Sequence, residues 1–333
     1  GRLAALVLTL TFGFLTIAHE GGEDMPATFL LLLTLVLLVR YVRTGDASHF
    51  LAASAAGGLA IGFKLTAVPV IVLIGIAHLY RAVQGGEFAW GRVRPALVIA
   101  GAATGLLVIV LSFPTTWVGR LDLVFQRIFG GSLARAGHPT GPDAHVTWWF
   151  LRGYLSGLGL PLFLASALGV LASAKRLLDR PEGADVALLV VTGLVTSLAI
   201  FSQWHDFRVH HLLWTMPLLA ILLAWSASRF LDRSPGLARP AIAVLLVSSA
   251  AYAGVGVATY ADMPRDQAVS YLEANADEGD TLEVYRRHLQ DTAVPHSMTV
   301  SHAFGPETPA ERPSTCPTYV QLGYRDLLYL SEG

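Results

Sequence analysis

The ionisable side chains of this sequence gather in short loops between strongly apolar stretches. Lys64 is the clearest candidate for chemistry, because it stands alone between the apolar stretches 49–63 and 65–82 and is one of only two lysines in the chain. An ionisable group at membrane depth is costly, and by default it marks a site. A lone ammonium there is suited to binding a phosphate or a carboxylate. The alternative is a lysine that merely extends to the lipid headgroups.

A cluster of acids precedes the apolar stretch 25–42. Glu20, Glu23 and Asp24 follow His19 within six residues. Acids at the start of a helix are ordinarily favoured as caps and by the helix dipole. Three acids exceed what one cap needs, so the functional interpretations are a general base, a hydroxyl-binding acid or a set of metal ligands.

A third polar loop contains His205, Asp206, Arg208, His210 and His211. Arg208 could hold a phosphate through two parallel hydrogen bonds, and a neighbouring histidine could donate a further one. A solvated loop without a role is the alternative. The histidines and acids of these loops include the residue types that bind divalent metals, but their spacing is not diagnostic of a metal site, so no cofactor or metal ligand is assigned. The candidates for acceptor binding or for a loop role are His19, Asp206, His211 and His145.

The elements that position these residues are predicted to be membrane-spanning helices. Hydrophobic residues make up 53% of the 333 residues and charged residues only 14%. Nine stretches approach the roughly 17–25 residues that a transmembrane helix needs. They are 2–18, 25–42, 49–63, 65–82, 95–116, 153–174, 184–203, 211–228 and 240–260. The composition therefore predicts an all-α polytopic membrane protein with about nine transmembrane helices.

The loops between these stretches alternate between two kinds. One kind is rich in arginine and the other mixes acids, histidines and single cations. Basic loops stay in the cytoplasm, so the mixed loops are predicted to meet on the extracytoplasmic face of the cell membrane, together with the chain after about residue 260. The basic groups are Arg40/Arg43, Arg81/Arg92/Arg94, Lys175/Arg176/Arg180 and Arg229/Arg233/Arg239.

Two domains are expected. Residues 1–260 form the transmembrane domain, in which the long loop 117–152 carries an amphipathic pattern over 121–129 that is typical of an interfacial helix. Residues 261–333 read as a small, incomplete extracytoplasmic α/β domain, with a helix at 266–276 and strands at 281–285 and 318–322. The net charge of −1 gives no electrostatic reason to expect nucleic acid, and the single cysteine excludes an internal disulfide.

These motifs, in this order, resemble those of the GT-C glycosyltransferases. The acid pair Glu23-Asp24 opens a helix, a basic turn follows it, and a small-residue helix from Gly57 leads into Lys64. Arg208 precedes a Pro-Leu-Leu helix at 217–219, with His210 and His211 where the family has an aromatic residue. The pattern is similar to the dolichyl-phosphate-mannose protein mannosyltransferase and lipid A aminoarabinose transferase group, and it covers about residues 1–260.

The resemblance implies inverting transfer of a hexose or pentose from a polyisoprenyl-phosphate donor to a protein, lipid or glycan acceptor on the extracytoplasmic face. Lys64, Arg208 and a histidine, His210 or His205, would neutralise the departing phosphate, and a carboxylate would take the acceptor's proton. In the family, the catalytic acid lies in the first outer loop, after the first helix, and this chain lacks such a loop. We therefore expect that the chain begins one or two helices late, that it is inactive alone, and that Asp24 positions substrate.

Two other classes of function remain open. A lipid or polysaccharide transporter, including a flippase, would carry ionisable groups near the membrane midplane and inverted repeats, whereas here the charges cluster at one face and no internal repeat is visible. A non-catalytic scaffold would leave Lys64 and the acid cluster unexplained.

Overall fold

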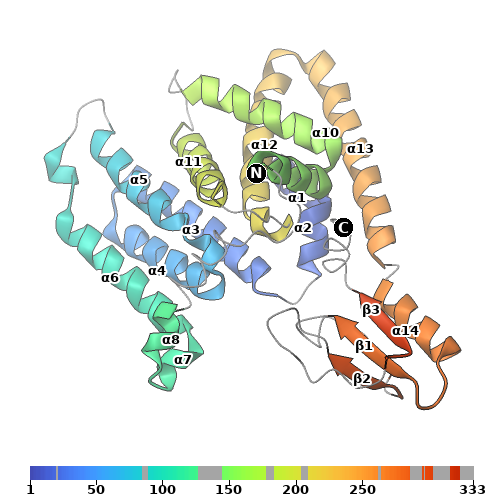
Figure 1. Ribbon diagram of the computed structural model, residues 1–333. Coiled ribbons are helices and arrows are strands. Elements are labelled where there is room, and N and C mark those ends of the chain that lie inside the picture. The colour runs from blue at the N-terminus through green and yellow to red at the C-terminus, as the bar shows by residue number, and fades with distance from the viewer. Residues whose placement is uncertain are drawn as a thin grey trace. The chain divides into compact units, whose positions relative to one another are not determined.

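The computed structural model describes residues 1–19, 22–84, 89–126, 145–177, 184–203, 209–261, 264–285, 295, 297–302 and 316–322. The described residues form two compact units, one up to residue 257 and the other from residue 258 onward. The first unit is helical, and the second combines a helix with a small sheet (Figure 1).

The helices of the first unit follow the apolar stretches of the sequence. In chain order they are α1 (Arg2–Thr9), α2 (Phe12–Ala18), α3 (Asp24–Thr44), α4 (Ala47–Phe63), η1 (Leu65–Ala67), α5 (Val70–Val83), η2 (Trp90–Arg92), α6 (Pro95–Ser112), α7 (Pro114–Trp117), α8 (Leu121–Phe125), α10 (Val146–Leu177), α11 (Ala184–Phe201), η4 (Val209–Leu212), α12 (Thr215–Arg233) and α13 (Pro235–Ala261).

Six helical segments in the described part of the chain are long and apolar enough to cross a membrane. They mark the chain as an integral membrane protein, but they do not confirm the expected nine spans. Of the other three expected spans, 2–18 is divided into two short helices, 49–63 lies in a helix of 17 residues, and 211–228 corresponds largely to α12. The six segments are Asp24–Thr44, Leu65–Val83, Trp90–Ser112, Val146–Lys175, Ala184–Phe201 and Pro235–Thr259.

The prediction of one continuous helix over 2–18 is wrong. The chain breaks between α1 and α2, where Thr11 has an extended backbone. The hydroxyl of Thr11 donates to the carbonyl of Val7, a side-chain interaction that competes with regular helix geometry. Beyond the break, Gly13 lies so close to α10 that a Cβ atom would be 2.8 Å from the Cα of Gly157. Tertiary packing therefore determines where this helix ends.

The helices α3, α4 and α6 pack side by side at small residues. Gly45 ends α3 in the left-handed region, at φ 73°, and the chain returns through α4. A Cβ atom on Gly58 would lie 2.5 Å from the carbonyl oxygen of Gly105 in α6, so these two backbones touch. The small residues of α4 allow the close helix–helix approach that the sequence predicts.

The helix α10 is kinked, which the sequence analysis missed. Gly159 has φ 73° inside it, and Pro161 lacks a backbone N–H. The hydroxyl of Tyr252 in α13 donates to the carbonyl oxygens of Ser156, at 3.0 Å, and Leu155, at 3.4 Å. A side chain from another helix thus donates to carbonyls directly before the kink.

The second unit consists of α14 (Pro264–Asn275), β1 (Thr281–Tyr285), β2 (Thr299–His302) and β3 (Tyr319–Leu322). The strands form a parallel sheet in the order β2-β1-β3, with Leu282 opposite Val300 on one side and Tyr319 on the other. Leu272 of α14 packs with Leu282 and Val284 in its core. The helix at 266–276 and both predicted strands are confirmed, and β2 is an addition.

The expected amphipathic helix over 121–129 is described only in its first half, as α8. Residues 127–129 lie outside the described part of the chain.

Candidate functional site

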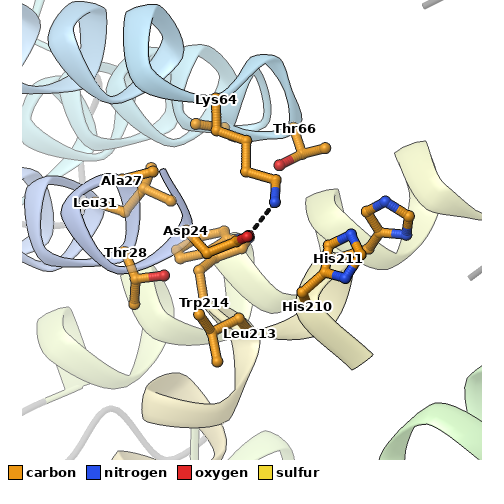
Figure 2. Close-up of a pocket in the computed structure, with 11 residues that line it drawn as sticks. Asp24, Ala27, Thr28, Leu31, Lys64, Thr66, His210, His211, Leu213 and Trp214 are labelled. Atoms are coloured by element: carbon orange, nitrogen blue, oxygen red, sulfur yellow. Dashed lines mark hydrogen bonds and ion pairs between the residues drawn. The ribbon is translucent and has the colours of Figure 1, made fainter. Parts of the chain in front are cut away.

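The strongest candidate site forms where α3 begins and α4 ends. The two helices are antiparallel neighbours, so Asp24 at the first residue of α3 meets Lys64, which follows the last residue of α4. The Lys64 ammonium donates to Oδ1 of Asp24 (Figure 2). The two side chains are only 12% and 15% exposed, respectively. Two residues forty positions apart thus form a mostly buried ion pair.

The ion pair lies at the edge of a small hollow. The other side chains that line it come from α3, from the segment after Lys64, from η4 and from the two residues before α12 (Figure 2). The hollow has room for about one water molecule. The lining residues besides the pair are Ala27, Thr28, Leu31, Thr66, Ala67, His210, His211, Leu213 and Trp214.

The short helix η4 brings His210 and His211 to this hollow. Their ring centroids are 4.1 Å apart, and the rings meet edge to face. His211 is 7% exposed, whereas His210 is half-buried. The sequence grouped these histidines with Lys64 as phosphate-binding or acceptor candidates, and the structure places both beside the Lys64–Asp24 pair.

The charges of the pair are balanced within the site. Asp24 lies in the first turn of α3, where the dipole of the helix favours a negative charge. Lys64 neutralises that carboxylate, and the carboxylate satisfies the ammonium. Removing either partner would leave a largely buried charge without compensation, which is strongly destabilising for a buried pair.

Trp214 is a lining residue that the sequence analysis missed. It is 4% exposed, and its Nε1 atom is buried without a hydrogen-bond partner in the described structure. The far edge of its ring faces α11, where Cη2 lies 2.9 Å from the position a Cβ atom would take on Gly193. A tryptophan at the start of an apolar helix reads as a core residue in sequence, and only the packed structure reveals the unpaired N–H.

Three other candidates do not line the hollow. Glu23 is exposed at the N-cap position of α3, and His19 is exposed at the end of α2. His145 is exposed before α10, with Nδ1 2.9 Å from the hydroxyl oxygen of Thr147. The remaining candidates, Glu20, His205, Asp206 and Arg208, lie outside the described residues.

Metal binding was a further interpretation of the acids and histidines. Within the described ranges, no three His, Cys, Asp or Glu side chains come close enough together to hold a metal ion. The hollow instead groups an ammonium, two imidazole rings and a tryptophan side chain with one carboxylate, a set of groups suited to binding an anion.

Comparisons of the chain with models of protein families, with curated proteins and with solved structures give no match.

Proposed function

We propose that the protein is an integral membrane glycosyltransferase of the GT-C type, which moves a sugar from a polyisoprenyl-phosphate donor to an acceptor at the extracytoplasmic face. The observation that carries the proposal is the grouping of Lys64, Asp24, His210 and His211 around one hollow at the ends of apolar helices. The order of these motifs along the chain, which resembles that of GT-C enzymes, supports the same interpretation.

The surroundings of the hollow suit a lipid-linked donor. Phe63 precedes Lys64 and is 46% exposed, and Phe29 lies just over one turn from Asp24 and is 65% exposed. Exposed apolar side chains on a membrane helix contact lipid tails. A polyisoprenyl chain can therefore remain in the bilayer along α3 and α4 while its phosphate reaches Lys64.

The proposed reaction is a displacement at the anomeric carbon of the donor. The acceptor oxygen forms a new bond to that carbon, and the bond from the carbon to the phosphate oxygen breaks with its electron pair going to the phosphate. The Lys64 ammonium stabilises the negative charge that grows on the leaving phosphate. A carboxylate takes the proton of the acceptor hydroxyl, and Asp24 at the hollow orients the sugar or the acceptor.

The proposal assigns the Asp24 end of the bundle, and the unit after residue 258, to the extracytoplasmic side. The distribution of arginines supports this assignment. Arg40 and Arg43 lie near the end of α3 that is far from Asp24, and Arg81 lies in the last turn of α5. Basic residues of this kind favour the cytoplasmic side. A transporter or flippase is the main rival. It is expected to carry charges near the middle of the membrane, whereas Asp24 and Lys64 lie at helix ends.

The test is sugar transfer by membranes that contain the protein expressed from its complete coding sequence, with a radiolabelled polyprenyl-phosphate sugar as donor. Replacing Lys64 by methionine removes the charge and keeps most of the volume. Loss of one charge-assisted phosphate contact costs about 1.5–3 kcal/mol, so transfer should fall about 10- to 150-fold.

The matched control is Lys175→Met, which removes the only other lysine, an exposed residue in the last turn of α10. This variant should transfer sugar at the normal rate. Normal transfer by a well-expressed Lys64→Met protein would refute the proposed role of Lys64.

A further inference from the structure

The ammonium that is proposed to hold the donor phosphate already has an anionic partner. Lys64 donates to the carboxylate of Asp24, and both side chains are mostly buried. The hollow beside them accommodates about one water molecule, far less than a phosphate group. A phosphate can reach Lys64 only if a side chain moves, and Asp24 is the group that lies where the phosphate oxygen would bind.

Trp214, which lines this hollow, has an indole N–H without a hydrogen-bond acceptor in the described structure. Its Nε1 is buried and unpaired among the described residues, and a buried donor without an acceptor is costly. The Asp24 carboxylate satisfies Lys64 but makes no hydrogen bond to Trp214. An anion with several oxygens could accept from both donors, which the carboxylate in its present position does not.

On the premise of the function proposed above, we propose that Asp24 holds the place of the donor phosphate and is exchanged for it. A phosphate oxygen of the polyprenyl-phosphate donor replaces the Asp24 carboxylate on Lys64 and accepts a hydrogen bond from Nε1 of Trp214. The exchange replaces one anion by another, so the buried ammonium is never left without a partner. The displaced carboxylate turns to the hydroxyl groups of the incoming sugar or acceptor.

This exchange makes Asp24 a competitor of the ligand. The wild-type protein must give up its own ion pair as the phosphate binds, and the displaced carboxylate then repels the phosphate. An asparagine at position 24 has nearly the same shape but no charge. The Asp24→Asn variant should therefore bind the phosphate more tightly than the wild type. If Asp24 only helped to hold the ligand, the same variant would bind it more weakly.

The experiment is equilibrium binding of a radiolabelled polyprenyl phosphate, without sugar, to the purified protein in lipid nanodiscs. Asp24→Asn should lower the dissociation constant at least about fivefold, because the phosphate no longer competes with a carboxylate for the mostly buried ammonium. Trp214→Phe, which keeps an aromatic ring but removes the N–H, should raise it about tenfold. The matched control is Trp225→Phe in α12, away from the hollow, which should leave the constant unchanged.

The outcomes separate this inference from the proposed function. Weaker or unchanged binding by Asp24→Asn, together with loss of binding in Lys64→Met, would overturn the exchange while leaving the phosphate site in place. Unchanged binding by Lys64→Met would overturn both. If Asp24→Asn does not yield folded protein, Asp24→Ser gives the same test, because it also removes the charge.

Discussion

The two ends of the helices α3, α4 and α5 both bury polar side chains, but they use them differently. At the end that contains Tyr41, its hydroxyl lies 2.8 Å from Nδ1 of His78, and the two rings stack against each other. Phe50 packs against both rings. At the other end, Lys64 and Asp24 face a hollow.

The packed end also satisfies the last carbonyls of α3. Arg81 donates to the carbonyl oxygen of Val42 at 3.1 Å, and Arg94 donates to that of Gly45 at 3.3 Å. These contacts complete the helix terminus, where cations are favoured. Nε2 of His78 has no hydrogen-bond partner in the described structure, so an orphan nitrogen alone does not distinguish the ends. The two ends differ because only the end with Lys64 and Asp24 combines, among the described residues, an ion pair with an adjoining hollow.

A buried polar residue in a membrane protein is therefore not, by itself, evidence of a functional site. The cluster around Tyr41 and His78 is explained by helix packing and helix termini. The charges of Lys64 and Asp24 also suit the helix ends at which they lie, but the two side chains pair with each other beside a hollow that Trp214 also lines.

Exchanging the two charges tests this contrast with the largest expected effect. Lys64→Asp alone places two carboxylates together and should destabilise the protein by about 3–5 kcal/mol, the range for breaking a buried pair. The double variant Asp24→Lys/Lys64→Asp restores attraction and should regain most of that stability, measured as the melting temperature in detergent.

The double variant should nevertheless remain at least about tenfold below the wild type in sugar transfer, because the ammonium now extends from α3 instead of following α4. Full recovery of both stability and transfer would show that the pair is only structural.

Gly45 tests the packed end. Its φ of 73° is unfavourable for other residues, and a Cβ atom there would lie 2.7 Å from a guanidinium nitrogen of Arg81. Gly45→Val should destabilise the protein by about 1–3 kcal/mol. Transfer per folded molecule should be unchanged, as measured by activity normalised to monodisperse protein. A selective loss of transfer would mean that the packed end also contributes to the site.

Tyr41→Phe sharpens the same point with a smaller change. It removes the hydroxyl that bonds to His78 and should cost about 1 kcal/mol of stability, a typical value for one hydrogen bond. We expect a lower melting temperature and a normal rate of transfer. A normal melting temperature would show that this hydrogen bond contributes nothing to folding.

Asp46 offers the smallest effect, and one that depends on pH. The backbone N–H of Ser48 donates to its carboxylate at the start of α4, and this hydrogen bond lowers the pKa of Asp46. Because the folded-state pKa is lower, the stabilisation is complete above the ordinary pKa of an aspartate and is lost as the pH falls through the lowered value. Asp46→Asn, which can still cap the helix, should reduce the acid sensitivity of the melting temperature. An identical pH profile would contradict this assignment.

The sequence predicts that Asp24 and Lys64 lie at the same end of the helix bundle. The first residue of α3 is Asp24, and α4 runs back in the opposite direction and ends directly before Lys64. Their direct pairing could not be predicted in this way, because it depends on how α3 and α4 are rotated about their axes, which tertiary packing decides.

Other features were beyond the sequence for similar reasons. The apolar run 2–18 gives no sign of its break at Thr11, which accompanies the approach of Gly13 to α10. The role proposed for Trp214 rests on its buried indole N–H, which has no hydrogen-bond partner in the described structure, and a sequence cannot reveal such an unpaired group. Local patterns predicted most of the helices and two of the three described strands, whereas tertiary contacts decided the breaks and the kink.

The most direct test of the central claim is an electron cryomicroscopy structure of the protein with a polyprenyl phosphate bound in a nanodisc. We expect phosphate density in the hollow, within hydrogen-bond distance of the Lys64 ammonium, and the Asp24 carboxylate displaced from it. A phosphate bound elsewhere, with the Lys64–Asp24 pair intact, would contradict the proposed exchange.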